Sequence, residues 1–96
     1  MLTGKQKRVL RSEANQMKPI FQVGKTGVNE NMIKQMDEAI DKRELIKLSV
    51  LQNCPLSKEE VAEQLSNQTA SEIVQIIGNN IVLYRKSKDN KLLEDQ

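Results

Sequence analysis

The chain has 96 residues and a net charge of +2, with 38% hydrophobic residues, one cysteine and no histidine. This length and hydrophobic content suit one domain with a single core. The absence of histidine removes the commonest general base and metal ligand, and Cys54 alone can form neither an internal disulfide nor a zinc site. We therefore expect a protein that is not an enzyme and that uses no cofactor, metal or small-molecule substrate.

We expect neither a targeting segment nor a membrane segment. Residues 1–16 lack the apolar stretch of a signal peptide, and no apolar run approaches the roughly 18 residues of a membrane helix. The sequence therefore predicts a cytoplasmic protein without a membrane partner.

The first helix is predicted to begin at Thr3 and to end before Pro19. Thr3 and Gln6 have the spacing of a capping box, apolar residues then recur at helical spacing, and proline cannot continue a helix. Residues 20–23 are a short strand candidate. This strand leads directly into residues 24–27, which read Gly-Lys-Thr-Gly.

A second helix and a second strand are predicted after this loop. Asn29 is a good N-cap, and the apolar residues behind it recur at helical spacing: Met32, Ile33, Met36, Ala39 and Ile40. Residues 45–51 alternate between apolar and polar side chains, which is typical of a strand with one buried face.

A third helix and a hairpin complete the predicted domain. Ser57 and Glu60 form another capping box at the start of an apolar-periodic segment. Residues 73–77 and 81–84 are β-branched runs separated by Gly-Asn-Asn at 78–80, and these turn residues tolerate positive φ. The pattern therefore predicts two strands joined by a hairpin turn.

The predicted order αβαβαββ gives an α+β fold, a compact domain with a four-stranded mixed sheet packed with helices. We expect this single domain to cover residues 1–86. Residues 87–96 are mostly polar or charged and are predicted to form a flexible tail, although Leu92 and Leu93 could dock on the domain.

The small net charge conceals a segregation along the chain. Residues 1–27 contain six basic residues and one acidic residue, a net charge of +5, whereas residues 28–77 contain five basic and nine acidic residues, a net charge of −4. Residues 78–96 contribute +1, from four basic and three acidic residues. Such asymmetry indicates a nucleic-acid or acidic partner, while solvated charged faces are the simpler alternative.

The loop at residues 24–27 is the strongest motif. Its Gly-Lys-Thr resembles the end of a phosphate-binding P-loop, but that motif needs a glycine where Pro19 stands, five positions before Gly24. The other interpretation is a G-x-x-G loop between a strand and a helix. Such loops clamp an RNA backbone in KH-type modules, with Lys25 adding a cation and Thr26 a hydroxyl donor.

Three separated segments resemble the CRM domain (chloroplast RNA splicing and ribosome maturation), and more closely the stand-alone bacterial YhbY-type proteins. They read LTGKQKRVLRSEAN at 2–15, PIFQVGKTGVNENMIKQMDEAIDKRELIKLSVL at 19–51 and VQIIGNNIVLYR at 74–85. The resemblance implies a fold like that of the C-terminal domain of translation initiation factor three. It also implies binding of structured RNA, and bacterial members are associated with maturation of the large ribosomal subunit.

The resemblance also implies where RNA would bind. The G-x-x-G loop of the family corresponds to residues 24–27, its basic first-helix surface to four cations between residues 5 and 11, and the end of its last strand to Tyr84 and Arg85. With neighbouring cations added, the candidate RNA-binding residues are Lys5, Lys7, Arg8, Arg11, Lys18, Gly24, Lys25, Thr26, Gly27, Arg85 and Lys86.

We expect the loop to press its N–H groups against a phosphate while the first-helix cations hold the adjoining RNA. The acidic segment 28–77 should then face away from RNA. Phe21 and Tyr84 are expected in the core rather than as stacking platforms, and Cys54 is expected to be buried or half-buried. The alternative function is a protein-interaction adaptor on ribosomal particles that uses the acidic face of the second helix. We expect a monomer in either case.

Overall fold

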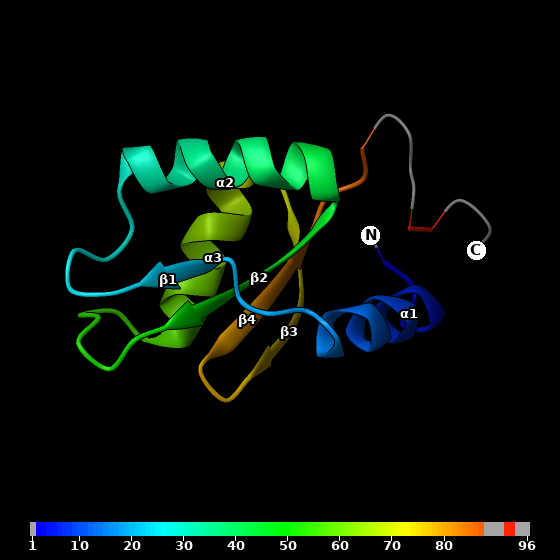
Figure 1. Ribbon diagram of the computed structural model, residues 1–96, viewed down its shortest axis with the longest axis horizontal. Coiled ribbons are helices and arrows are strands. Elements are labelled where there is room, and N and C mark those ends of the chain that lie inside the picture. Colours follow the sequence, from blue (N-terminus) through cyan, green and yellow to red (C-terminus); the bar gives the residue numbers. More distant parts are fainter. Residues whose placement is uncertain (1, 88–91, 94–96) are drawn as a thin grey trace.

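The computed structural model describes residues 2–87 and 92–93 and has the predicted α+β fold, with three helices and a four-stranded mixed sheet (Figure 1). The elements follow in the predicted order αβαβαββ. They are α1 (Gly4–Asn15), β1 (Phe21–Val23), α2 (Glu30–Arg43), β2 (Leu45–Val50), α3 (Lys58–Thr69), β3 (Glu72–Ile77) and β4 (Asn80–Tyr84).

All three helices begin where the sequence predicts, because each cap is made by side chains close in the chain. The Thr3 hydroxyl accepts from the Gln6 N–H at 3.1 Å, and the Gln6 side chain accepts from the Thr3 N–H at 3.0 Å. Ser57 and Glu60 repeat this capping box at α3, where the hydrogen bond from the Ser57 backbone lowers the pKa of Glu60. Asn29 caps α2.

The sheet has the strand order β1-β2-β4-β3. β1 and β2 run parallel and are connected through α2, while β4 pairs antiparallel with both β2 and β3. The predicted hairpin is confirmed, and its turn is formed by Gly78 and Asn79, with φ of +57° at Gly78. A positive φ at the first turn position is the conformation for which glycine is favoured in two-residue hairpins.

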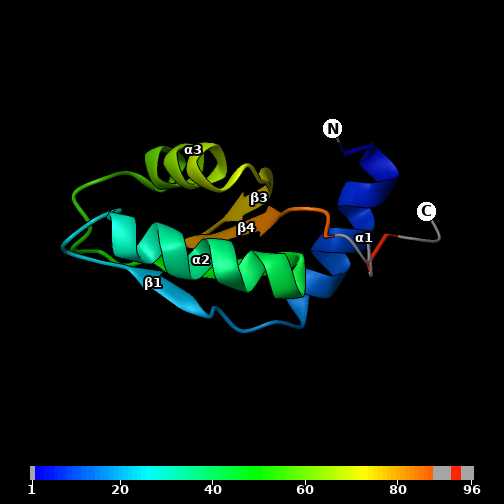
Figure 2. The same ribbon diagram turned by 90° about the horizontal axis from the view of Figure 1, so that it is seen from above.

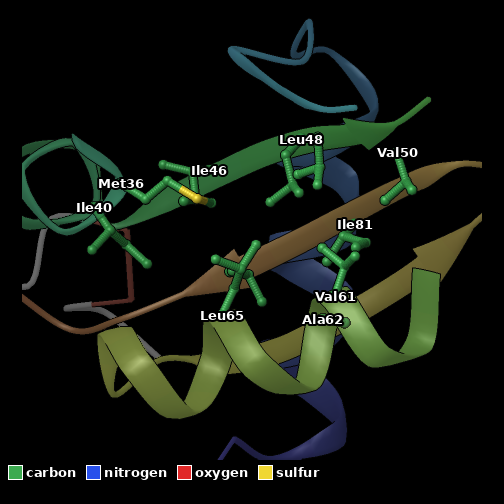
Figure 3. Close-up of a cluster of buried hydrophobic side chains, with 11 residues drawn as sticks. Met36, Ile40, Ile46, Leu48, Val50, Val61, Ala62, Leu65 and Ile81 are labelled. Carbon is green, nitrogen blue, oxygen red and sulfur yellow. The ribbon is translucent and has the colours of Figure 1, made fainter. Parts of the chain in front are cut away.

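The larger core cluster lies between one face of the sheet and helices α2 and α3 (Figure 3). Met36 and Ile40 of α2 and Leu65 of α3 are fully buried, which confirms the predicted apolar stripes. The sheet contributes alternate residues to this cluster: Val23 from β1, Ile46, Leu48 and Val50 from β2, and Ile81 and Leu83 from β4. The other face of the sheet is therefore left for α1.

A second cluster lies between α1 and that other face. Leu10 and Ala14 of α1 pack with Leu45, Val74, Val82 and Tyr84 of the sheet, and with Leu93. Leu93 is buried and Leu92 packs beside it, so this pair docks as the sequence indicated. Residues 88–91 and 94–96 of the predicted tail lie outside the described residues.

A buried carboxylate secures the chain after β4. Glu44, at the C-terminal end of α2, is fully buried and accepts hydrogen bonds from the N–H groups of Ser87 at 3.2 Å and Leu92 at 2.9 Å. The Ser87 hydroxyl also bonds to it. Hydrogen bonds of this kind offset the cost of burying a charge, so Glu44 connects the C-terminal segment to the domain. Within residues 2–87 and 92–93, no helix has the length and apolar character needed to span a membrane.

Candidate functional site

The 24–27 loop is a tight turn that directs two polar side chains outward. The Gly27 N–H donates to the Gly24 carbonyl oxygen at 2.9 Å, which places Lys25 and Thr26 at the centre of the turn, and both are exposed. Gly27 has a φ of +65°, where a side chain would be strained. The sequence therefore needs glycine at 27 to close this turn after β1.

A second loop, residues 51–57, lies against the 24–27 loop at the same end of the sheet (Figure 2). A Cβ at Gly24 would lie 3.3 Å from the Asn53 side chain, and one at Gly27 would lie 3.8 Å from Leu56. The parallel pairing of β1 and β2 brings their C-terminal ends together. The position of Asn53 beside the 24–27 loop could not be predicted from the sequence, because no local pattern of residues shows that β1 and β2 are neighbours.

The turn has free N–H groups, whereas the start of α2 already carries a side-chain cap and a carboxylate. Within the part of the chain that the structure describes, the N–H groups of Lys25 and Thr26 donate to no other group. At α2, the Asn29 side chain accepts from the Met32 N–H at 2.9 Å, and Glu30 places a carboxylate in the first turn. A phosphate would therefore gain more from the turn than from the helix end.

Helix α1 carries the four predicted cations. Lys5 and Arg8 are exposed, Lys7 and Arg11 are half-buried, and none has an ion pair among the described residues. The first turn of α1 contains no acidic residue, although the positive end of the helix dipole favours negative charge there. Helix stability therefore does not account for Lys5 and Lys7, which stand in that first turn.

The loop and α1 lie at opposite ends of the longest axis, which measures 40 Å (Figures 1 and 2). The predicted site residues of the loop and of α1 thus form two groups, and exposed Lys18 lies on the segment 16–20 that connects them. Lys47 of β2 fixes α1 on the sheet, since its ammonium donates to the carbonyls of Ala14 at 3.2 Å and Met17 at 3.3 Å.

The Arg85 side chain forms ion pairs and a hydrogen bond within the domain. Its guanidinium pairs with the Asp37 carboxylate at 2.5 Å and with Asp41 at 3.7 Å, and it donates to the Thr69 carbonyl at 2.8 Å. Lys86 beside it is exposed. The structure thus places Arg85 against α2 rather than beside the 24–27 loop, and two carboxylates of the acidic α2 face are occupied by it.

The model of the CRS1/YhbY (CRM) domain matches residues 2–85. The chain belongs to this family. It is 64% identical over 94 residues to the Bacillus subtilis protein named "Probable RNA-binding protein YqeI", with 98% of each chain covered. It is 31% identical over 91 residues to a Haemophilus influenzae protein named "RNA-binding protein", covering 95% of this chain and 92% of the relative.

The fold of this CRM domain also matches a solved structure. The solution structure of the hypothetical Staphylococcus aureus protein SAV1595 is 63% identical in sequence and superimposes with a TM-score of 0.80, covering 95% of each chain. The family match includes the loop, α1 and Arg85, so only Lys86 among the predicted site residues lies beyond it.

The aromatic residues of this CRM domain contribute to its core, as the sequence predicts. Phe21 packs against the larger cluster, and Tyr84 is 4% exposed beneath α1. Burial raises the pKa of Tyr84, with the carboxylates of Glu44 and Glu72 adding to the shift. Cys54 is half-buried, as expected. Among the described residues, no cluster of three His, Cys, Asp or Glu could hold a metal ion.

Proposed function

We propose that this protein binds structured RNA through two cationic groups, the 24–27 loop and the basic face of α1. The observation that carries the proposal is the set of unpaired cations in the first 27 residues, which lie on α1, the connecting segment and the loop. Lys5 and Lys7 stand in the first turn of α1, where the helix dipole disfavours cations, so a partner with negative charge explains this pair better than helix stability does. Membership in the CRM family and the names of the relatives support RNA as that partner.

In the proposed mechanism each group contacts the phosphate backbone at a separate place. Lys25 and the free N–H groups of the turn bind one phosphate, with the Thr26 hydroxyl as a further donor. Lys5, Lys7, Arg8 and Arg11 contact phosphates at the other end, and Lys18 lies between. Phosphate contacts position a protein without reading sequence, so recognition depends mainly on the shape of the RNA. Arg85 contributes to the fold that holds these groups rather than to binding.

A charge-reversal variant tests this proposal. Lys25→Glu combined with Arg8→Glu should lower affinity for a fragment of large-subunit ribosomal RNA at least ~10-fold in about 0.1 M salt, because hydrogen bonds to charged groups contribute about 1.5–3 kcal/mol each. The slope of log K against log salt should also fall by roughly 0.7–0.9 for each phosphate that the variant no longer neutralises.

The matched control is Lys34→Glu combined with Lys42→Glu. Both lysines are exposed on α2, which covers the opposite face of the sheet, and the change in net charge is identical. The control should bind nearly as tightly as the natural protein. An equal loss of RNA affinity in the two double variants would mean that binding depends on net charge and not on the position of the cations. Unchanged affinity after the Lys25 and Arg8 reversal would overturn the proposed site.

We further propose that the RNA is large-subunit ribosomal RNA or its precursor and that the protein acts, without catalysis, as a cytoplasmic monomer during ribosome assembly. The resemblance to YhbY-type proteins supports this target. Crosslinking in cells followed by sequencing of the attached RNA tests it directly. A signal concentrated in one region of the large-subunit precursor is expected, and a signal spread over unrelated messages would contradict it.

A further inference from the structure

A single row of side chains crosses all four strands beside the 24–27 loop. In the sheet register, Gln22 pairs with Ser49, Ser49 pairs with Asn80, and Asn80 pairs with Ile77. The strand neighbours of the first three residues pack in the larger core cluster. Because strand side chains alternate between faces, Gln22, Ser49 and Asn80, here called the polar row, point away from α2 and α3.

The polar row is accessible and its hydrogen-bonding groups are free. Helix α1 packs on the other end of this face, over Leu45, Val82 and Tyr84, while Gln22 is exposed and Ser49 and Asn80 are half-buried. Within residues 2–87 and 92–93, none of the three side chains makes a hydrogen bond. Two amides and a hydroxyl supply both donors and acceptors, so the row can bind a polar surface.

Charge around the polar row favours a polyanion. The 24–27 loop begins two residues after Gln22, and α1 carries its cations on the same side of the sheet. The exposed carboxylates of Glu30, Glu38, Glu59 and Glu63 belong to α2 or α3, which cover the opposite face. The row therefore lies between the two cationic groups and away from these acids.

The side chains on this face determine whether it suits single-stranded or duplex RNA. The chain has one phenylalanine, one tyrosine and no tryptophan, and both aromatics contact the core clusters, so this face offers no platform for stacking unpaired bases. The minor groove of an A-form duplex is wide and shallow and displays ribose 2′-hydroxyls. The polar row crosses three strands and spans about 10 Å, or about 14 Å with Ile77 on the fourth strand, at a strand spacing of about 4.8 Å. Its donors and acceptors suit such a groove.

Resting on the RNA-binding function proposed above, we propose that the polar row docks in the minor groove of an A-form RNA duplex and exchanges hydrogen bonds with 2′-hydroxyls. The 24–27 loop and the α1 cations, which lie on either side of the row along the strand direction, then contact phosphates on either side of that groove. Ile77, which is 58% exposed at the end of the row on β3, provides an apolar contact for a ribose ring. The row thus distinguishes RNA from DNA, which the phosphate contacts alone do not.

The experiment compares binding of an RNA duplex and a DNA duplex of the same sequence. The natural protein should prefer RNA. The triple variant Gln22→Ala, Ser49→Ala, Asn80→Ala should bind RNA at least ~10-fold more weakly, since removing each hydrogen bond corresponds to about 2- to 10-fold, and its affinity for DNA should change little. Its salt slope should stay unchanged, because no charge is removed.

The matched control is Gln64→Ala, Asn67→Ala, Gln68→Ala, which removes three exposed amides from α3 on the opposite face and should leave the RNA preference intact. A second measurement needs no variant: 2′-O-methylation of the duplex removes the hydroxyl donors and should weaken binding by the natural protein. This measurement keeps the test valid if the triple variant unfolds.

The outcomes separate this inference from the proposed function. If the natural protein binds no RNA, the proposed function fails. If it binds RNA but the triple variant keeps its preference over DNA, or if 2′-O-methylation has no effect, the minor-groove contact is wrong while the phosphate contacts stand. Tighter binding to a single strand than to the duplex would likewise overturn docking in a groove.

Discussion

Substitution of Gly27 by alanine should destabilise the domain by an amount set by backbone conformation alone. At a φ of +65°, a residue with a Cβ in the left-handed region costs about 1–2 kcal/mol. The new Cβ would lie 3.8 Å from Leu56 and Pro55, an ordinary contact. Because alanine also restricts the unfolded chain, which offsets about 0.4–1 kcal/mol of that cost, we expect a net loss of ~1 kcal/mol, which corresponds to a Tm lower by about 4–8 °C.

Two further substitutions test whether the positive φ of Gly27 is the cause of this loss. Gly27→Asn should lose less than Gly27→Ala, because asparagine tolerates the left-handed region. Gly24→Ala should change stability little: Gly24 does not have a positive φ, and the side chains of Asn53 and Leu51, which its Cβ would approach, are exposed and can shift. Urea denaturation followed by circular dichroism measures all three. Equal stability of the natural protein and Gly27→Ala, or a larger loss at Gly24, would refute the reasoning.

Three other predictions follow from burial and pairing. Leu65→Ala should cost about 2–5 kcal/mol in urea denaturation, because Leu65 is fully buried, and a loss under ~1 kcal/mol would contradict its packing. Burial raises the pKa of Tyr84 above its ordinary value of 10.0. The contribution of the neutral phenol to the free energy of unfolding is therefore complete below pH 10 and is lost as pH rises through the folded pKa. The phenolate absorbance of this single tyrosine should appear at a higher pH in the folded protein than in denaturant. Arg85→Ala should cost about 1–2 kcal/mol because its bonds to Asp37 and Thr69 are removed, and it should leave the salt slope of RNA binding unchanged; a slope lower by ~1 would place Arg85 on RNA.

The sequence predicted features that depend on residues close in the chain. A capping box joins side chains and N–H groups three residues apart, so Thr3 and Ser57 identify the starts of their helices regardless of tertiary structure. The alternation of residues 45–51 identifies a strand for the same reason, although the strand ends at Val50. Neither pattern specifies which strands become neighbours, so the order β1-β2-β4-β3 and the contact between the two loops required the structure.

Charged residues were hardest to interpret because sequence gives their sign but not their partners. Glu44 follows Lys42 and Arg43 in a run that is typical of charges paired along a helix, yet its carboxylate is fully buried and accepts bonds from Ser87 and Leu92. Arg85 reads as a free cation at a strand end, yet Asp37, 48 residues away, pairs with it. Partners so distant in sequence have no spacing that a local pattern could detect.

The basic first quarter of the chain illustrates the same limit for the candidate site. Six cations within 27 residues suggest one continuous patch, but residues 16–20 separate α1 from β1. Five extended residues reach up to about 17 Å, and Lys47 fixes the C-terminal end of α1 on the α1 face of the sheet. The 24–27 loop lies beyond β1, at the opposite end of the longest axis from α1, with the polar row in between (Figures 1 and 2). A net charge of +5 indicated a polyanion as partner, whereas its separation into two groups indicates a partner long enough to contact both.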